Sequence, residues 1–381
     1  ATLEKFQLFA GRISTLMNPA TYIVINVATI GILWVGGDRV NTGSLTQGQV
    51  VALVNYMSQI LIELIKLANL IINLTKAFAA SGRIQDIFDI EPGMAEGNIE
   101  LNLVNDNNSN DGTGKLAGEN DSDNKLKNPE NYNKDIAVEF ENATLKYEGA
   151  GESSIENVNF KAKTGQTIGI IGGTGSGKTS LINMIPRFYD PTEGKVKIFG
   201  IDAKDYKRKN LEDIIGVVPQ KALLFKGTIR SNLLWGNENA TEEELVEALK
   251  LSQSYDFEKD KGIDSEVAQK GKNFSGGQKQ RLTIARALVK KPKILILDDS
   301  SSALDYATDA KLRSDIKTLK DITLFVVSQR TASIMDADRI VVLDDGKVVG
   351  FGTHDELLKD CSVYQEIYQS QFKKGGQSNG K

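Results

Sequence analysis

The chain has 381 residues, with 46 basic and 50 acidic side chains and one cysteine, Cys361. This length allows two domains, the nearly balanced charge gives no reason to expect nucleic acid as a partner, and a lone cysteine excludes a disulfide within the chain and suits a reducing compartment. No signal-peptide pattern is visible. Because the sequence begins with Ala1 on a helix-like stretch already in progress, we expect a fragment whose N-terminal part is missing.

Two long apolar stretches come first. Residues 13–35 are almost wholly uncharged, and such a stretch can cross about 30 Å of hydrocarbon at about 1.5 Å per helical residue. The Gly-Gly-Asp sequence at residues 36–38 is expected to end this helix, and residues 41–44 to form a polar loop before a second apolar stretch at residues 50–74. A pair of buried helices in a soluble protein is the alternative, but two runs of this length favour two membrane spans.

Basic residues predict the orientation of these spans. Lys5, Arg12, Lys76 and Arg83 flank the outer ends of the pair, whereas the loop between the spans holds only Arg39. Positive charge concentrates on the cytoplasmic side of a membrane, so the ends are predicted to be cytoplasmic and the loop external. We therefore expect a multi-pass protein of the cell membrane, in contact with membrane lipid, whose remaining residues lie in the cytoplasm.

The second stretch contains two charged residues, Glu63 and Lys66. Residues three positions apart are neighbours on one helical face, so these two side chains can pair. Charges at bilayer depth usually face the interior of a helix bundle or a watery cavity. Two interpretations stay open: the pair lines a translocation pathway, or the charges neutralise each other against another helix.

The composition changes after residue 90. From about residue 98 the sequence is rich in Asn, Asp, Gly and Lys, with too few apolar groups to offset the conformational entropy of ordering. We predict a disordered linker at residues 91–135, better explained as a solvated spacer than as a regulatory segment. It separates residues 1–90 from a soluble α/β domain at residues 136–372, and residues 373–381 are predicted to be a flexible tail.

A glycine-rich loop at residues 172–179 follows a short apolar strand at residues 167–171 and leads into a helix. A phosphate-binding P-loop requires this strand–loop–helix context, because backbone N–H groups surround a phosphate and the helix N-terminus adds partial positive charge. Lys178 is predicted to neutralise the β- and γ-phosphates, and the Thr179 hydroxyl to ligate Mg²⁺. The predicted ATP-binding residues here are Gly172, Gly173, Thr174, Gly175, Ser176, Gly177, Lys178, Thr179 and Ser180.

Two later motifs complete the pattern. Residues 294–298 form an apolar run that follows Pro292 and ends in Asp298, which predicts a buried parallel strand that delivers a Mg²⁺-side carboxylate to its C-terminal edge. The second motif lies upstream and opens a helical stretch through about Val289, with a helix N-terminus that favours an anion. It consists of Ser275, Gly276, Gly277 and Gln278.

These motifs, in this order and after two spans, resemble the ATP-binding cassette (ABC) superfamily, and within it exporters whose membrane and nucleotide domains share one chain. The resemblance covers nearly the whole chain outside the Asn-rich insert. It implies ATP and Mg²⁺ as cofactors. It also implies the fold: the last two spans of a six-helix transmembrane domain, followed by an α/β P-loop domain with a helical subdomain. In such proteins two nucleotide domains meet head to tail, and each ATP lies between one P-loop and the other domain's signature.

The resemblance assigns further residues. Tyr147 corresponds to the aromatic residue that stacks on adenine, Gln220 to the Q-loop glutamine near Mg²⁺, and Asp305 to a residue of the D-loop. Residues 275–278 correspond to the signature. Residues 265–271 resemble the segment that contacts the membrane domain in exporters, although their middle is less charged than usual.

Two positions depart from the family pattern. Asp299 stands where a Glu polarises the attacking water, and its side chain is one methylene shorter, a retreat of about 1.5 Å. Gln329 replaces the switch histidine that contacts the γ-phosphate, and the one histidine of the chain, His354, lies elsewhere. A glutamine can donate a hydrogen bond but carries no positive charge. We expect a site that binds ATP and hydrolyses it poorly.

This asymmetry favours the degenerate half of a heterodimeric ABC exporter, in which the chain lends an intact signature to the catalytic site of a second half-transporter subunit. A slow homodimeric exporter and a non-transporting, ATP-gated regulatory subunit are the alternatives. A soluble cassette protein of DNA maintenance fits less well, because of the two spans. The exported substrate stays open among amphiphilic drugs, lipids and peptides.

Overall fold

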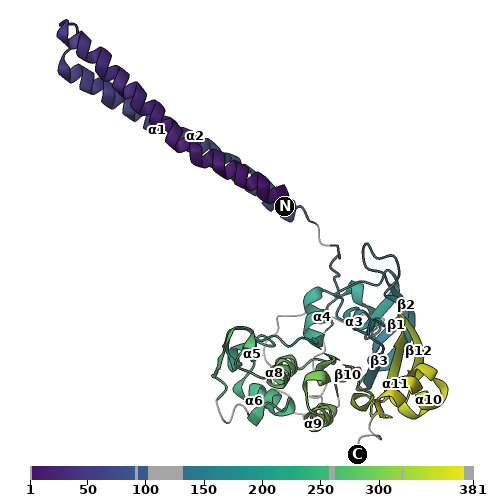
Figure 1. Ribbon diagram of the computed structural model, residues 1–381. Helices are drawn as coiled ribbons and strands as arrows, with labels where there is room; N and C mark the ends of the chain where they lie inside the picture. Colours follow the sequence, from purple (N-terminus) through teal and green to yellow (C-terminus); the bar gives the residue numbers. More distant parts are fainter. Residues whose placement is uncertain (1, 91–92, 102–131, 257–261, 320, 373–381) are drawn as a thin grey trace, which may run out of the picture. The chain divides into compact units, whose positions relative to one another are not determined.

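The computed structural model describes residues 2–90, 93–101, 132–256, 262–319 and 321–372, which fall into two compact units, Ala1–Gly93 and Met94–Lys381 (Figure 1). The predicted flexible tail and most of the predicted disordered linker lie outside the described residues. The described part of the linker is ordered, against the prediction: Ile99 forms a bridge with Tyr206, and Leu101 is buried in the core of the second unit. Each unit is described by itself below.

The first unit is a hairpin of two helices, α1 (Thr2–Asn41) and α2 (Gln47–Phe88). A capping box starts α2: the Thr46 side chain accepts from the Gln49 N–H, and the Gln49 side chain accepts from the Thr46 N–H. The segments Thr21–Asn41 and Gln47–Phe88 are long and apolar enough to cross a membrane, with mean hydropathies of 1.5 and 1.6. These helices contain the two predicted spans and extend beyond them.

The predicted end of the first helix at residues 36–38 is wrong, because α1 continues to Asn41. A neighbouring helix explains the glycine: a Cβ atom on Gly36 would lie 2.8 Å from Cγ1 of Val50 in α2. Gly36 therefore serves the close approach of two helices rather than a helix stop.

The predicted pairing of Glu63 with Lys66 is confirmed. The Lys66 ammonium donates to the Glu63 carboxylate at 2.6 Å, across the exposed surface of α2. Neither of the two interpretations of the pair, a pathway lining or a mutual neutralisation, is decided by this contact.

The second unit is built on two sheets (Figure 1). A six-stranded sheet has the order β12-β11-β3-β10-β9-β6, with parallel pairing from β11 through to β6 and β12 antiparallel at the edge. Its strands are β3 (Thr167–Gly172), β6 (Ile215–Val218), β9 (Ile294–Asp298), β10 (Thr323–Val327), β11 (Arg339–Asp344) and β12 (Lys347–Gly352). An antiparallel sheet has the order β2-β1-β4-β5 and comprises β1 (Ile136–Leu145), β2 (Ile155–Lys163), β4 (Glu193–Ile198) and β5 (Ile201–Asp202). A short pair joins β7 (Gly227–Thr228) to β8 (Glu266–Val267).

Helices cover these sheets and form a helical subdomain. The α-helices are α3 (Lys178–Asn183), α4 (Arg208–Ile214), α5 (Ile229–Leu234), α6 (Glu242–Leu251), α8 (Gly276–Val289), α9 (Tyr306–Lys317), α10 (His354–Asp360) and α11 (Ser362–Phe372). Single 3-10 turns lie at Ala203–Asp205, Gln269–Gly271, Ser300–Ala303 and Thr331–Ser333. In the helical subdomain α8 packs against α5 and α6.

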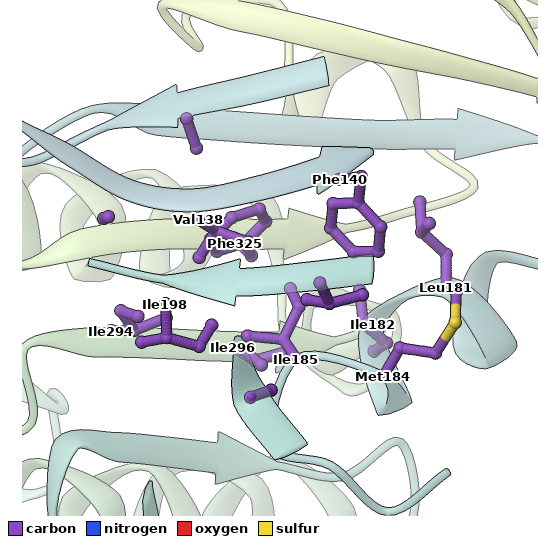
Figure 2. Packing of buried hydrophobic residues seen from close by; sticks show 14 of the residues in the cluster. Val138, Phe140, Leu181, Ile182, Met184, Ile185, Ile198, Ile294, Ile296 and Phe325 are labelled. Atoms are coloured by element: carbon purple, nitrogen blue, oxygen red, sulfur yellow. The ribbon is translucent and has the colours of Figure 1, made fainter. Parts of the chain in front are cut away.

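Buried strands join two hydrophobic clusters. In β9, Ile294 and Ile296 belong to the cluster that holds Phe140 of the antiparallel sheet, whereas Leu295 and Leu297 belong to the cluster that holds α6 and α8. Figure 2 shows residues of the first cluster, which include these isoleucines, Ile198 of β4 and Ile182 of α3. Burial of both faces is typical of a central parallel strand, so the prediction of a buried strand at residues 294–298 is confirmed.

The close approach at Gly36 predicts a matched pair of variants. Gly36→Leu should force α1 away from Val50, because overpacking typically costs about 1–3 kcal/mol. Gly37→Leu is the control, since a Cβ atom there would meet nothing within 4 Å. Spin labels at the exposed positions Tyr22 and Leu64 should report a longer or broader interhelical distance for the first variant alone. The same distribution in both variants would contradict a packing role for Gly36.

Candidate functional site

The glycine-rich loop lies between the end of β3 and the start of α3, as the sequence predicts. Gly177 has a φ angle of 93°, and a Cβ atom on it would lie 2.6 Å from the Ser154 carbonyl oxygen. Only glycine meets both conditions without strain. Behind the loop, the Gly346 N–H donates to the Ser176 carbonyl oxygen at 3.3 Å, so the turn between β11 and β12 supports the loop.

Lys178 bridges the two sides of the glycine-rich loop through hydrogen bonds to its backbone. Its ammonium donates to the carbonyl oxygens of Gly173 at 2.6 Å and Gly172 at 3.0 Å. Partial burial lowers the pKa of Lys178, and the nearby carboxylates of Asp299 and Asp298 oppose this effect. The loop therefore surrounds a positive charge, as a polyphosphate-binding loop requires.

Thr179 and Asp298 meet at the edge of the sheet. The Thr179 hydroxyl donates to the Asp298 carboxylate at 3.2 Å, and this carboxylate lies at the C-terminal end of β9 with 7% of the residue exposed. Burial raises the pKa of Asp298, and the Thr179 hydrogen bond partly opposes that rise. The two predicted Mg²⁺ ligands thus come together, although 119 positions separate them in sequence.

The next residue, Asp299, has a left-handed backbone conformation with φ 45° and ψ 32°. Its N–H donates to the Val327 carbonyl oxygen at 3.0 Å, which fixes the backbone beside β10. The Gln220 side chain donates to the Asp299 carboxylate at 3.3 Å. The predicted Q-loop glutamine and the residue at the base position are therefore direct neighbours.

These residues line one cleft of about 480 Å³, a volume within the usual range for small-molecule sites. Of the predicted residues, its lining contains Thr174, Gly175, Gly177, Lys178, Thr179, Ser180, Gln220, Asp298, Asp299 and Gln329. Asp345 and Gly346 also line it and were not predicted. The sequence pattern that could have indicated this turn is the Asp-Gly pair itself, which is common in two-residue hairpin turns. In the structure the two residues have φ angles of 43° and 75°.

Tyr147 lies beside this cleft. Its hydroxyl donates to the Ser180 hydroxyl at 2.9 Å, and its ring meets the Tyr189 ring edge-on with centroids 4.9 Å apart. The half-buried ring is thus held next to the start of α3, and its stacking on adenine stays a prediction.

The predicted signature lies on a different element. Ser275 is the N-cap of α8 and forms a capping box with Gln278. A Cβ atom on Gly277 would lie 3.0 Å from the Ala303 carbonyl oxygen. Asp305 caps α9 and accepts from the N–H of Thr308 at 2.9 Å. Among the described residues that line the cleft, no signature residue and no Asp305 is present.

The cleft fits a magnesium nucleotide. A Cβ atom on Gly173 or Gly175 would meet nothing within 4 Å, so the open side of the loop has room for phosphates. No group of three or more His, Cys, Asp or Glu that could hold a metal is found in the described part of the chain. Mg²⁺ in nucleotide sites usually takes one or two carboxylates together with phosphate oxygens and water, and Thr179 with Asp298 would supply the protein side.

Comparison with known families decides the nature of this unit. Residues 155–302 match the ABC transporter family. The second unit contains an ABC transporter ATP-binding domain. ABC domains bind ATP, generally with Mg²⁺, and the glycine-rich loop, the Asp298 strand and the predicted signature all lie within the matched residues.

Relatives and a solved structure extend the comparison beyond the ABC domain. The chain is 37% identical over 378 residues to the uncharacterized ABC transporter ATP-binding protein YfiB of Bacillus subtilis, covering 98% of this chain and 60% of that protein. It is 32% identical over 357 residues to the ATP-dependent lipid A-core flippase of Desulfotalea psychrophila, covering 93% of this chain and 57% of the relative. The chain thus spans 60% or less of the length of these relatives.

The structure of a bacterial Atm1-family ABC exporter with ATP bound is similar to this chain, with a TM-score of 0.73 and 28% identity over 94% of this chain and 58% of that one. The order of elements, a helical segment followed by a P-loop ABC domain, therefore matches an exporter fold.

The raised pKa of Asp298 predicts a pH-dependent effect of Asp298→Asn. The carboxyl ionises at a lower pH in the unfolded chain, so the nucleotide-free protein loses stability as pH rises from the unfolded to the folded pKa, and the loss is complete above both. The variant removes this cost. Thermal melts should show a higher unfolding midpoint than wild type at neutral pH, and this gap should shrink as pH falls toward about 4 and be closed below it, while Mg²⁺-dependent ATP binding is lost. A lower midpoint at neutral pH would contradict the assignment.

Proposed function

We propose that this chain is the ATP-binding subunit of an ABC exporter, with a hydrolysis-impaired site of its own and an intact signature that it lends to a partner subunit. The observation that carries the proposal is the ABC cleft itself, with Asp299 and Gln329 at the positions where the family places a catalytic Glu and a His. The exporter-type relatives and the Atm1-family fold support transport as the coupled process.

The contacts of Asp299 support weak catalysis. A general base must lie about 2.6–3.2 Å from the atom whose proton it takes, and this carboxylate is about 1.5 Å shorter in reach than a glutamate. It also accepts a hydrogen bond from Gln220 at 3.3 Å, which occupies one of its oxygens. A shorter reach and an engaged oxygen both disfavour contact with a water in line with a γ-phosphate.

Gln329 supports the same conclusion at the second position. It follows β10, is exposed, and lines the cleft. Its amide can donate one hydrogen bond to a γ-phosphate oxygen, but it supplies no positive charge. Neither departure removes a residue predicted to bind ATP or Mg²⁺: Lys178 lies in the glycine loop, and Thr179 donates to Asp298.

The positions of the motifs favour a heterodimer. Ser275 and its neighbours lie on α8, outside the cleft lining of the described residues, so a second domain's signature would complete this site and this chain's signature would complete another. Two copies of this chain would form two impaired sites. A partner subunit that supplies the Glu and the His gives one working site, with the two spans of this chain forming part of the membrane domain.

Restoring the family's residues at positions 299 and 329 should restore ATP hydrolysis. The chain purified alone should show very low ATP turnover, and the double variant Asp299→Glu plus Gln329→His should raise turnover by at least about tenfold, since a positioned base typically contributes about 10²–10⁴-fold. Steady-state phosphate release measures both, and Lys178→Ala added to the double variant is the background control. Brisk turnover by the parent would instead establish a homodimeric ATPase.

In the complex with the partner subunit, ATPase activity should depend on Ser275 of this chain and not on Asp299. Replacing Ser275 should abolish ATPase activity of the complex, because the partner's P-loop needs this signature, whereas Asp299→Ala should change the activity less than about twofold. Ser275→Thr keeps an N-cap oxygen and tests whether a loss reflects the end of α8 alone. Loss of activity in Asp299→Ala with retention in the Ser275 variant would refute the assignment.

A further inference from the structure

The side chain of Gln371, at the C-terminal end of α11, holds the backbone that follows the switch residue. Its amide nitrogen donates to the Gln329 carbonyl oxygen at 2.7 Å, and its amide oxygen accepts from the Thr331 N–H at 2.8 Å. A carboxamide presents a donor and an acceptor side by side, so one side chain satisfies two backbone groups that lie two residues apart.

Other bonds fix the switch segment on its strand side. The Ser328 N–H donates to the Ile170 carbonyl oxygen of β3 at 3.1 Å, and the Ser328 hydroxyl accepts from the Arg330 N–H at 2.9 Å. Ser328 and Thr331 are fully buried, whereas Gln329 between them is exposed. One bond of Gln371 therefore acts on the exposed Gln329 and the other on the buried Thr331, so together they hold both ends of the exposed stretch.

Helix α11, which carries Gln371, is anchored by packing against the core. Tyr364 is fully buried in the cluster of the helical subdomain, and its hydroxyl lies 2.7 Å from Nδ1 of His354 in α10. Ile367 packs against the same cluster. Tyr364, Ile367 and Gln371 follow each other at intervals of three and four residues, which places them on one face of the helix. The core that buries Tyr364 thus also sets the position of Gln371.

We propose that Gln371 is a positioning residue that sets the direction of the Gln329 side chain toward the γ-phosphate of bound ATP. The inference rests on the proposed function, in which Gln329 occupies the switch position. Gln371 acts through the Gln329 carbonyl group and the Thr331 N–H, and not through contact with nucleotide. The switch residue is expected to contact only the γ-phosphate, which ADP lacks. Loss of the Gln371 contact should therefore weaken binding of ATP and leave binding of ADP unchanged.

The test compares MgATP and MgADP affinities of the full-length chain by equilibrium titration. Gln371→Met keeps the length of the side chain and removes both hydrogen bonds. We expect its ATP affinity to fall about threefold to tenfold, less than complete loss of a hydrogen bond to a charged group would cause, with ADP affinity unchanged. Gln371→Glu keeps the acceptor for Thr331 but sets a carboxylate against the Gln329 carbonyl oxygen, so it should show at least the same selective loss.

Gln365→Met is the matched control. Gln365 lies on the same helix and also donates to backbone carbonyl oxygens, those of Leu358 at 2.8 Å and Lys359 at 3.2 Å, away from the switch segment. It should leave both affinities unchanged. An equal loss of ATP and ADP binding in Gln371→Met, or the same selective loss in Gln365→Met, would mean that α11 only stabilises the domain and would overturn the proposal.

Gln329→Ala, titrated in parallel, separates this proposal from the one on which it rests. If Gln329→Ala selectively weakens ATP binding and the Gln371 variants do not, the positioning role is wrong and the proposed function stands. If Gln329→Ala leaves the ratio of ATP to ADP affinity unchanged, the switch role and the positioning role fail together. Thermal melts confirm that each variant is folded, which the exposure of Gln371 leads us to expect.

Discussion

The register of three neighbouring parallel strands decides where the phosphate-side groups of the ABC domain lie. Val327 of β10 pairs with Ile170 of β3 on one side and with Asp298 of β9 on the other. The glycine loop, Asp298 and Gln329 consequently emerge together at the carboxyl edge of the sheet, where open α/β sheets bind their ligands. A slip of one residue in β9 would turn every side chain of that strand to the opposite face and remove Asp298 from Thr179.

Several polar residues that are predicted to contact ATP also stabilise the local structure of this domain. Ser275 and Asp305 cap the helices that they begin, and Lys178 closes the loop that it charges. An N-cap is typically worth about 1 kcal/mol, so replacement of such a residue perturbs local structure and ligand contacts together. Conservative variants that keep the cap are needed before a loss of activity is assigned to contact with ATP.

Sequence reasoning predicted the elements whose signals are local. The strand β9 and the helix α8 have the predicted limits. Pro292 disfavours regular structure just before β9, and Ser275 caps the start of α8. The continuation of α1 through Gly36 could not be predicted, since its cause is a contact with Val50 on another helix. The contact of Gln371 with Gln329 joins residues 42 positions apart, and no local pattern marks a glutamine that bonds to a distant backbone.

The left-handed conformation of Asp299 bears on how such a site changes over evolution. Aspartate enters this region of backbone space more readily than most side chains, which carry a cost of about 1–2 kcal/mol there. A codon change to glutamate would lengthen the side chain and also penalise the backbone geometry that now surrounds it. A glutamate at position 299 would therefore gain reach at the expense of local backbone stability, a folding cost that substitutions in the neighbouring turn could offset.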